Sequence, residues 1–357
     1  MSKTTKRVFS GTRATGRLHL GNYLGAVKGY IQLQENPDYS CIYMVMDLHT
    51  ITTPYNPQGL PAASREIILD YLAAGLDPQK AIITAQSSVP QHPYLAFLFS
   101  SVMTVARMQH LPTFKEKAAQ YPDDITMALL NYPVLMAADI LIYQAELVPV
   151  GIDQEPHLEI SREIARKMNQ RFKTNFPEPQ RFATPGEYVP SLKGLGKMSK
   201  SIEGSYINLT DNLETITQKL AATPTDSGQG RVQEIKQSSE SKTSTSFKKY
   251  FDQVSQEESH GVASLLQLVK LFQGEEKLRH YESLYQDRGI KYLQLKTELA
   301  RAIFEELQPI QKKRQELEAK PGYLEEIVQE GAKQAQVIAE KTLIEVKNKM
   351  GLGLTSR

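Results

Sequence analysis

Apolar residues follow two patterns along this chain. Short continuous runs are typical of parallel strands buried on both faces of a sheet. These runs are Val8 with Phe9, residues 41–46, residues 81–85 and residues 147–150. Between them, apolar residues recur at helical spacing, over residues 61–74 and in Leu158, Ile160, Ile164 and Met168. The alternation predicts an α/β fold with a doubly wound parallel sheet of the Rossmann type.

Residues 8–25 are the stretch around which this pattern is organised. They read as a strand, a turn containing Gly11 and Gly16, and the start of an amphipathic helix. Glycine permits backbone conformations and close approaches that a side chain forbids. The first turn of the helix offers unpaired N–H groups and positive partial charge near His19, which suit a phosphate chain. The spacing matches neither a P-loop nor a dinucleotide-binding fingerprint.

Residues 92–143 interrupt the alternation, because they read as almost wholly helical. Pro112, Pro122 and Pro133 are expected to mark boundaries or kinks. We interpret the segment as a helical insertion between two halves of the sheet. Residues 175–201 are rich in Pro, Gly and Lys and read as a long loop.

The composition changes after Gly204, where polar helix-forming sequence dominates. Residues 262–272 and 292–307 carry apolar residues at helical spacing and are expected to pack together. Residues 225–246 are rich in Ser, Thr, Gln and Lys and are expected to be flexible. The prediction is an α/β domain over residues 1–204 and a C-terminal helical bundle over residues 205–357.

Charge and composition restrict the function less than the pattern does. The chain has 357 residues and a formal net charge of +2, so any nucleic-acid surface must be a local patch. Cys41 is the one cysteine and lies in an apolar run, which excludes an internal disulfide and predicts a buried thiol. No apolar run is long enough to span a bilayer and the N-terminus lacks a signal-peptide pattern, so we expect a cytoplasmic protein.

Two motifs resemble a known family. His19-Leu20-Gly21-Asn22 and Lys197-Met198-Ser199-Lys200-Ser201 resemble the HIGH and KMSKS motifs of class I aminoacyl-tRNA synthetases. The intervening segments are similar to the bacterial tryptophanyl-tRNA synthetases over nearly the whole chain. The resemblance implies ATP and L-tryptophan as substrates, Mg²⁺, a tryptophanyl-adenylate and tRNA(Trp), with no DNA or membrane partner. It also implies a homodimer formed through residues 92–143 and an anticodon-binding role for residues 205–357.

The resemblance also assigns roles to residues. The catalytic set would be His19, Asn22, Lys117, Lys197, Ser199 and Lys200. The ATP-binding set would add Arg13, Ala14, Thr15, Gly21, Gly151, Ile152, Asp153, Val189, Met198 and Ser201. Two ammonium groups on one loop can neutralise charge that develops on a leaving pyrophosphate. Lys115 could fill the role of Lys117, and Arg13-Ala14-Thr15 lacks the proline of related motifs, which leaves that loop less preset.

Asp139 is the sharpest candidate for recognising the amino acid. It lies in a strongly apolar helical stretch, where a carboxylate is costly unless it is paired, although a solvent-facing Asp is the simpler alternative. The resemblance makes Asp139 the acceptor for the indole N–H. Around it would lie Phe9, Gly11, His49, Tyr132, Met136, Val150 and Gln154, each of which could equally be a core or turn residue.

Other functions remain possible at this level. Tyrosyl-tRNA synthetases share the architecture, but a phenol requires a donor and an acceptor at its hydroxyl. A non-catalytic tRNA- or nucleotide-binding paralogue would have no need for Lys197, Ser199 and Lys200. A simple ATP-using nucleotidyltransferase would have no evident use for the helical C-terminal domain. His157 has no second ligand at metal-binding spacing, so no metal site is predicted.

Overall fold

The computed structural model of the chain describes residues 5–184, 186, 188–194, 196–200, 202–226 and 260–353. The chain forms two compact units. The first comprises residues 1–17, 28–184 and 316–357, and the second comprises residues 18–27 and 185–315. No helix in the described residues is long and apolar enough to cross a membrane.

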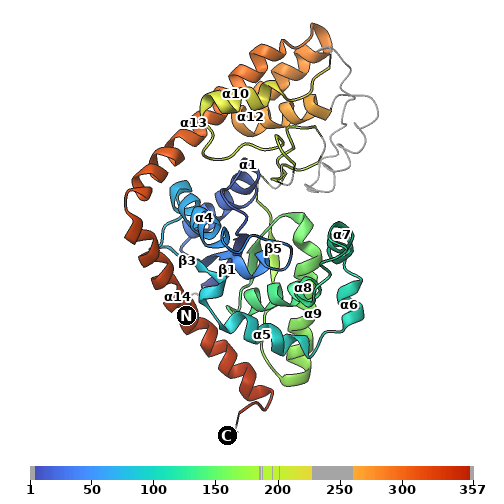
Figure 1. The fold of residues 1–357 in the computed structure, drawn as a ribbon, viewed down its shortest axis with the longest axis vertical. Coiled ribbons are helices and arrows are strands. Elements are labelled where there is room, and N and C mark those ends of the chain that lie inside the picture. Colours follow the sequence, from blue (N-terminus) through green and yellow to red (C-terminus); the bar gives the residue numbers. More distant parts are fainter. Residues whose placement is uncertain are drawn as a thin grey trace. The chain divides into compact units, whose positions relative to one another are not determined.

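A five-stranded parallel sheet forms the centre of the first unit (Figure 1). The strands are β1 (Lys6–Arg13), β2 (Tyr39–Met46), β3 (Ala81–Ala85), β4 (Leu147–Pro149) and β5 (Gln180–Phe182). Their order is β3-β2-β1-β4-β5, so the direction of winding reverses beside β1. Open α/β sheets bind ligands at the carboxyl ends of the strands next to such a reversal. The predicted doubly wound sheet is therefore confirmed.

Strand β5 corrects the sequence prediction. It lies within residues 175–201, which were expected to form a loop without a strand. Arg181 pairs with Val148 of β4 in parallel register. The three-residue strand is only partly buried, so it lacks the apolar run that marks the other strands.

Helices cover both faces of the sheet, with α4 on one face and α5 and α8 on the other (Figure 1). The helices of the first unit between the strands are α2 (Lys28–Gln34), α3 (Asp47–Thr50), α4 (Leu60–Ala74), α5 (Gln91–Ser100), α6 (Val105–Gln109), α7 (Pro112–Gln120), α8 (Met127–Leu141) and α9 (Glu155–Phe172). Short 3₁₀ turns η2 (Gln86–Ser88) and η3 (Ile152–Gln154) follow β3 and β4. The predicted helical insertion is confirmed as α5 to α8. Pro112 lies in the first turn of α7, whereas Pro133 lies inside α8.

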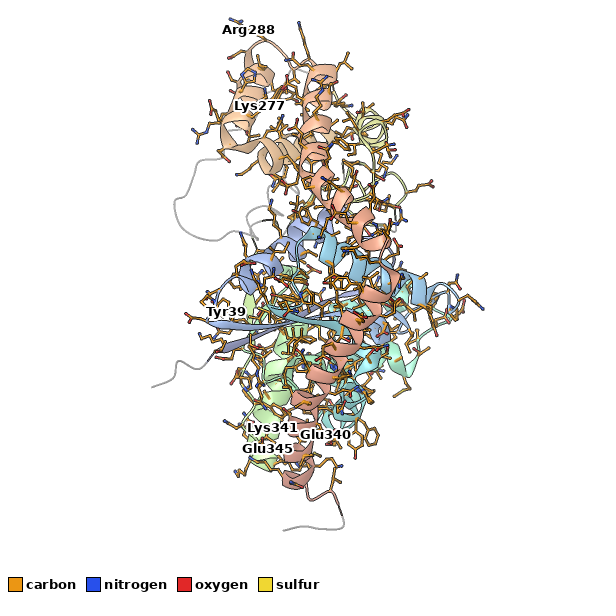
Figure 2. All side chains as sticks on the ribbon, turned by 90° about the vertical axis from the view of Figure 1, so that its left-hand side faces the viewer. Tyr39, Lys277, Arg288, Glu340, Lys341 and Glu345 are labelled. Carbon is orange, nitrogen blue, oxygen red and sulfur yellow. The ribbon has the colours of Figure 1, made fainter. Side chains whose placement is uncertain are left out.

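The last helix, α14 (Pro321–Lys349), packs on the edge strand β3 (Figure 1). Thr84 of β3 donates a hydrogen bond of 2.9 Å to the Val328 carbonyl. A Cβ on Gly331 would lie 2.2 Å from the Ile83 carbonyl oxygen, so only glycine permits this close approach. The exposed side chains of α14 include Glu340, Lys341 and Glu345 (Figure 2).

The predicted boundary at residue 205 is therefore corrected at the C-terminal end. Residues 316–357 belong to the first unit. The buried apolar core of this unit includes four side chains of α14: Ala335, Ala339, Leu343 and Val346. By packing on β3, α14 also covers this edge of the sheet.

The second unit combines helices from its two sequence segments, residues 18–27 and 185–315. It comprises α1 (Leu20–Asn22), the π-helix η1 (Tyr23–Val27), α10 (Leu213–Ala221), α12 (His260–Asp287) and most of α13 (Tyr292–Glu318). Glu298 of α13 forms an ion pair with Lys277 of α12 at 2.7 Å and accepts a hydrogen bond from the Tyr281 hydroxyl of α12 at 2.9 Å. Figure 2 labels Lys277 on α12. The expected flexible segment 225–246 lies outside the described residues, apart from 225 and 226.

Candidate functional site

Helix α8 presents one functional face. Thr126 caps its N-terminus by accepting a hydrogen bond from the Leu129 N–H. Tyr132, Met136 and Asp139 are spaced by four and three residues, so they lie on the same side of the helix. Asp139 is 0% exposed, whereas Tyr132 and Met136 are only partly buried. This face therefore extends from the core to the accessible surface, and Asp139 is not the solvent-facing residue of the simpler interpretation.

Three side chains converge on the Asp139 carboxylate. Oδ1 lies 2.7 Å from Gln86 Nε2 and 2.5 Å from His92 Nδ1. Oδ2 lies 2.7 Å from His49 Nε2. The partners come from the turn after β3, from α5 and from α3, so three separate segments hold one carboxylate.

The charge of Asp139 is favoured by these contacts. Burial by itself would raise the pKa of the carboxyl group, but the hydrogen bonds from His49 and His92 outweigh burial and lower it to about 2. An ionised carboxylate can only accept hydrogen bonds. His49 Nε2 and His92 Nδ1 are therefore donors.

The network continues away from Asp139 into the core. His92 Nε2 lies 2.7 Å from the Tyr143 hydroxyl, and both side chains are fully buried. The Tyr143 ring stacks on Phe9 with a centroid separation of 5.4 Å. Phe9 is 3% exposed and belongs to the buried core cluster, so it supports the far end of this network.

A second cluster adjoins this face of α8. The Tyr132 hydroxyl donates to Thr113 Oγ1 at 2.7 Å and lies 2.7 Å from His157 Nε2. The His49 ring meets the Tyr132 ring edge-on, with centroids 6.3 Å apart. Burial, and to a lesser extent His49, lowers the pKa of His157 to about 4. His157 is therefore a neutral group that orients Tyr132.

Gly11 and the loop after β1 supply the next predicted residues. A Cβ on Gly11 would lie 2.5 Å from the Met44 carbonyl oxygen, which explains the glycine. Arg13 Nη2 donates to Thr53 Oγ1 at 2.8 Å, and the Ala14 N–H donates to Thr50 Oγ1 at 2.9 Å. The Thr15 N–H donates to the Arg13 carbonyl at 2.8 Å. Bonds to α3 and the following turn thus fix a loop that lacks the expected proline.

The end of β4 carries the other predicted residues of this unit. Val150 is partly buried against the core, and Gly151 precedes η3. Ile152 and Asp153 are exposed, and Gln154 Nε2 donates to Asp153 Oδ2 at 2.7 Å. Because β4 and β1 are neighbours in the sheet, this turn and the Arg13–Thr15 loop both lie at the reversal of strand order.

His19 organises the motif in the second unit. Its Nδ1 accepts from the Gly21 N–H at 3.0 Å, while Asn22 Oδ1 accepts from the His19 N–H at 3.2 Å, forming a capping box. Burial, followed by the charges of Lys200 and Lys197, lowers the pKa of the His19 ring to about 3. In the neutral ring Nδ1 is the acceptor, so Nε2 carries the proton and can donate. The Asn22 amide NH₂ is likewise a donor.

The Lys197–Lys200 segment lies in the same unit and is fixed by backbone pairing. The Met198 N–H donates to the Val189 carbonyl at 2.8 Å, and both side chains are buried. A Cβ on Gly21 would lie 3.4 Å from Met198 Cβ, so the two distant motifs approach each other here. Ser205 donates to the Ser199 carbonyl at 2.5 Å, and Ser201 lies outside the described residues.

The contacts of the Lys117 ammonium group with described residues are local. Lys117 lies on α7 and donates to Gln120 Oε1 at 2.7 Å, one turn further along the same helix. Lys115 is exposed on that helix. The predicted choice between these two lysines is therefore left open.

Sequence reasoning missed Gln86, His92, Thr113 and Tyr143. Gln86 follows the carboxyl end of β3 directly, so the rule that selected the ends of β2 and β4 could have found it. His92 lies in the first turn of α5, and nothing in its local pattern indicates that it meets Asp139.

Comparisons with known proteins extend this description. The family model described as class I tRNA synthetases (W and Y) matches residues 1–308. The chain is 36% identical over 348 residues to the tryptophan-tRNA ligase of Porphyromonas gingivalis, covering 96% of this chain and 98% of that protein. Its fold resembles tryptophanyl-tRNA synthetase from Mycoplasma pneumoniae, with a TM-score of 0.81, 32% identity and coverage of 98% and 99%. It also resembles the enzyme from Campylobacter jejuni complexed with ADP and tryptophan, with a TM-score of 0.77, 28% identity and coverage of 97% and 100%.

Proposed function

The chain belongs to the class I tRNA synthetases of the W and Y family, and from this membership we propose that it joins L-tryptophan to tRNA(Trp) at the expense of ATP. The enzyme forms tryptophanyl-adenylate and pyrophosphate from tryptophan and ATP. It then transfers the tryptophanyl group to the tRNA and releases AMP. The observation that carries this function is the similarity to a tryptophan-tRNA ligase over 96% of the chain.

We propose that Asp139 reads the amino-acid side chain. Indole offers one N–H donor and no acceptor, so one buried carboxylate is sufficient to recognise it. The partly buried Tyr132 and Met136 share the face of α8 with Asp139 and are proposed to contact the ring. His49, Gly11 and Val150 belong to the same proposed site, and Gln154 is proposed to meet the polar end of tryptophan.

Donors of the second unit are proposed to hold the phosphates of ATP. His19 Nε2–H, the Asn22 amide and the ammonium groups of Lys197 and Lys200 all favour negative charge. The influence of both lysines on the His19 pKa supports a shared electrostatic environment. The side chain of Met198 is buried and packs the segment, and Ser199 is proposed as a further donor.

Residues of the first unit are proposed to contact other parts of ATP. Asp153 can accept from ribose hydroxyls, and Gly151 and Ile152 are proposed to contact the nucleotide beside it. Arg13, Ala14 and Thr15 are proposed to contact ATP from the end of β1. Among the described residues, no three His, Cys, Asp or Glu side chains could hold a metal ion. Mg²⁺ is therefore proposed to enter bound to the phosphate oxygens of ATP.

The proposed mechanism relies on positioning and charge neutralisation. The tryptophan carboxylate attacks the α-phosphorus in line, and the bond to the bridging oxygen of pyrophosphate breaks. Lys197 and Lys200 neutralise the charge that develops on the leaving group. The ribose 2′-hydroxyl of the terminal adenosine of tRNA then attacks the tryptophanyl carbonyl and displaces AMP. No side chain of the protein becomes covalently attached.

Aminoacylation tests this function. Purified protein, ATP, Mg²⁺ and unfractionated tRNA should convert radiolabelled tryptophan into acid-precipitable tryptophanyl-tRNA. Radiolabelled tyrosine tests the other specificity in this family and should remain soluble. Precipitation of tyrosine instead of tryptophan would overturn the assignment.

A homodimer through the helical insertion is also proposed. The insertion exposes large apolar side chains: Phe97 is 77% exposed, Met127 73%, Val105 58% and Ile125 53%. Surface of this kind on a soluble chain marks an interaction site. Helices α10 and α12 and residues 292–315 of α13 are proposed to bind the tRNA anticodon, and charging is proposed to take place in the cytoplasm.

Sedimentation of two variants tests the dimer. Wild type is expected to sediment at twice the chain mass of 40.2 kDa, because the exposed apolar side chains of two copies cover each other. Phe97→Glu should sediment as a monomer at micromolar concentration. Leu293→Glu is the matched control, since Leu293 is 84% exposed on α13 outside the insertion, and it should remain dimeric. A monomeric wild type with full activity would contradict the proposal.

A further inference from the structure

The two oxygens of the Asp139 carboxylate differ in what they can still accept. An ionised carboxylate has about four lone-pair positions, two on each oxygen. Oδ1 receives Gln86 at 2.7 Å and His92 at 2.5 Å, which occupies both of its positions. Among the residues that the structure describes, Oδ2 receives only His49, at 2.7 Å. One acceptor position therefore remains, and it belongs to Oδ2.

The orientation of the carboxylate depends on His92. Its ring is 0% exposed, like Asp139, so bulk solvent does not reach this contact. His92 donates from Nδ1 to the Asp139 carboxylate, and its Nε2 lies 2.7 Å from the Tyr143 hydroxyl. Phe9 stacks on Tyr143 and limits movement at that end. Both nitrogens of the His92 ring are thus engaged, and the ring is held in one orientation.

We infer that His92 is a positioning residue for specificity, which locks Asp139 Oδ1 so that Oδ2 is the atom that accepts the indole N–H. This inference rests on the proposed reading of tryptophan by Asp139. His92 itself touches neither substrate. Without its N–H, the carboxylate can rotate about its terminal torsion, which is soft, and Oδ2 is no longer held toward the ring.

Two substitutions separate the donor to Asp139 from the contact to Tyr143. His92→Asn places an amide near the position of Nδ1, so it can still donate to Asp139 but does not reach Tyr143. His92→Gln places its amide near Nε2, so it retains Tyr143 and loses the donor to Asp139. Both variants are polar and both lose the ring, so a general packing defect affects them alike.

The measured quantity is the preference for tryptophan over its benzothiophene analogue, which has no N–H. It is the ratio of kcat/KM values in ATP–pyrophosphate exchange. His92→Gln should lower this ratio by about ten-fold, the usual effect of losing orientation of one charged hydrogen bond, whereas His92→Asn should keep it within about two-fold of wild type. If the role of His92 were purely structural, both variants would lower kcat/KM for the two amino acids equally, and the ratio would stay unchanged.

The outcomes are distinguishable from a failure of the proposed function. If His92→Gln keeps the wild-type ratio, or if both variants lose it equally, His92 does not position Asp139 and the inference is overturned. If wild type itself shows no preference for tryptophan, the proposed function fails first. If His92→Asn does not fold, the ratio in His92→Gln still decides, because an unchanged ratio overturns the inference and a lowered one supports it.

Discussion

Replacing Asp139 with alanine should reduce kcat/KM for tryptophan by about ten- to a hundred-fold, the range for losing a hydrogen bond to a charged group. The benzothiophene analogue donates no hydrogen bond, so its kcat/KM should change far less. The preference of the enzyme for tryptophan over this analogue should therefore nearly vanish. Parallel measurements of pyrophosphate exchange with the two amino acids give this ratio directly.

Stability alone cannot test the role of Asp139. Alanine leaves the buried donors of Gln86, His49 and His92 without their acceptor, so the free energy of unfolding should also fall. The analogue ratio separates recognition from this structural loss. If Asp139→Ala keeps the full wild-type preference for tryptophan, Asp139 is not the residue that recognises the indole N–H.

The variant Asp139→Asn keeps the shape of the side chain but has one acceptor oxygen in place of two. Its one carbonyl oxygen is expected to take the place of Oδ1, where two donors converge, which directs the NH₂ group to the position of Oδ2. Indole has no acceptor to offer to this NH₂ group. We therefore expect the asparagine variant to lose nearly as much of the preference as the alanine variant.

Lys200→Ala should slow adenylate formation on the order of a hundred-fold, as when one preorganised donor is removed from a developing negative charge. Tryptophan binding should remain nearly unchanged, because the ammonium group acts on the separating pyrophosphate rather than on the amino acid. Single-turnover kinetics and equilibrium titration with tryptophan measure the two quantities separately.

Lys193→Ala is the matched control for this variant. Lys193 is an exposed lysine of the same unit, seven residues earlier in the chain than Lys200, and lies outside the motif. The substitution Lys193→Ala removes the same charge from the protein as Lys200→Ala, so a general electrostatic effect would appear in both variants. An activation rate that is equal in Lys200→Ala and wild type would remove Lys200 from the proposed catalytic set.

Local sequence pattern predicted those parts of the fold whose burial is complete. β2 is buried along most of its length and appears in the sequence as an uninterrupted apolar run. Asp139 was identifiable because a carboxylate in an apolar helix requires partners. Gly11 and Gly16 were expected to serve close approach or unusual backbone, and Gly16 has φ of +90°.

The parts that were missed depend on contacts between distant segments. β5 is a short, half-exposed strand that exists only because β4 offers it an edge. α14 was predicted only as part of a C-terminal helical bundle, and its local sequence does not indicate that it meets β3 across more than two hundred residues of chain. His92 and Gln86 have no local signature, since their importance comes from a carboxylate on another helix.

ATP–pyrophosphate exchange with each of the twenty amino acids, one at a time, tests the central claim most directly. The reaction requires only activation of the amino acid, so it reports on the site around Asp139 without involving tRNA. We expect label to enter ATP with tryptophan far faster than with tyrosine, phenylalanine or any other amino acid. Exchange driven preferentially by tyrosine, or by none of the twenty, would contradict the proposed reading of tryptophan.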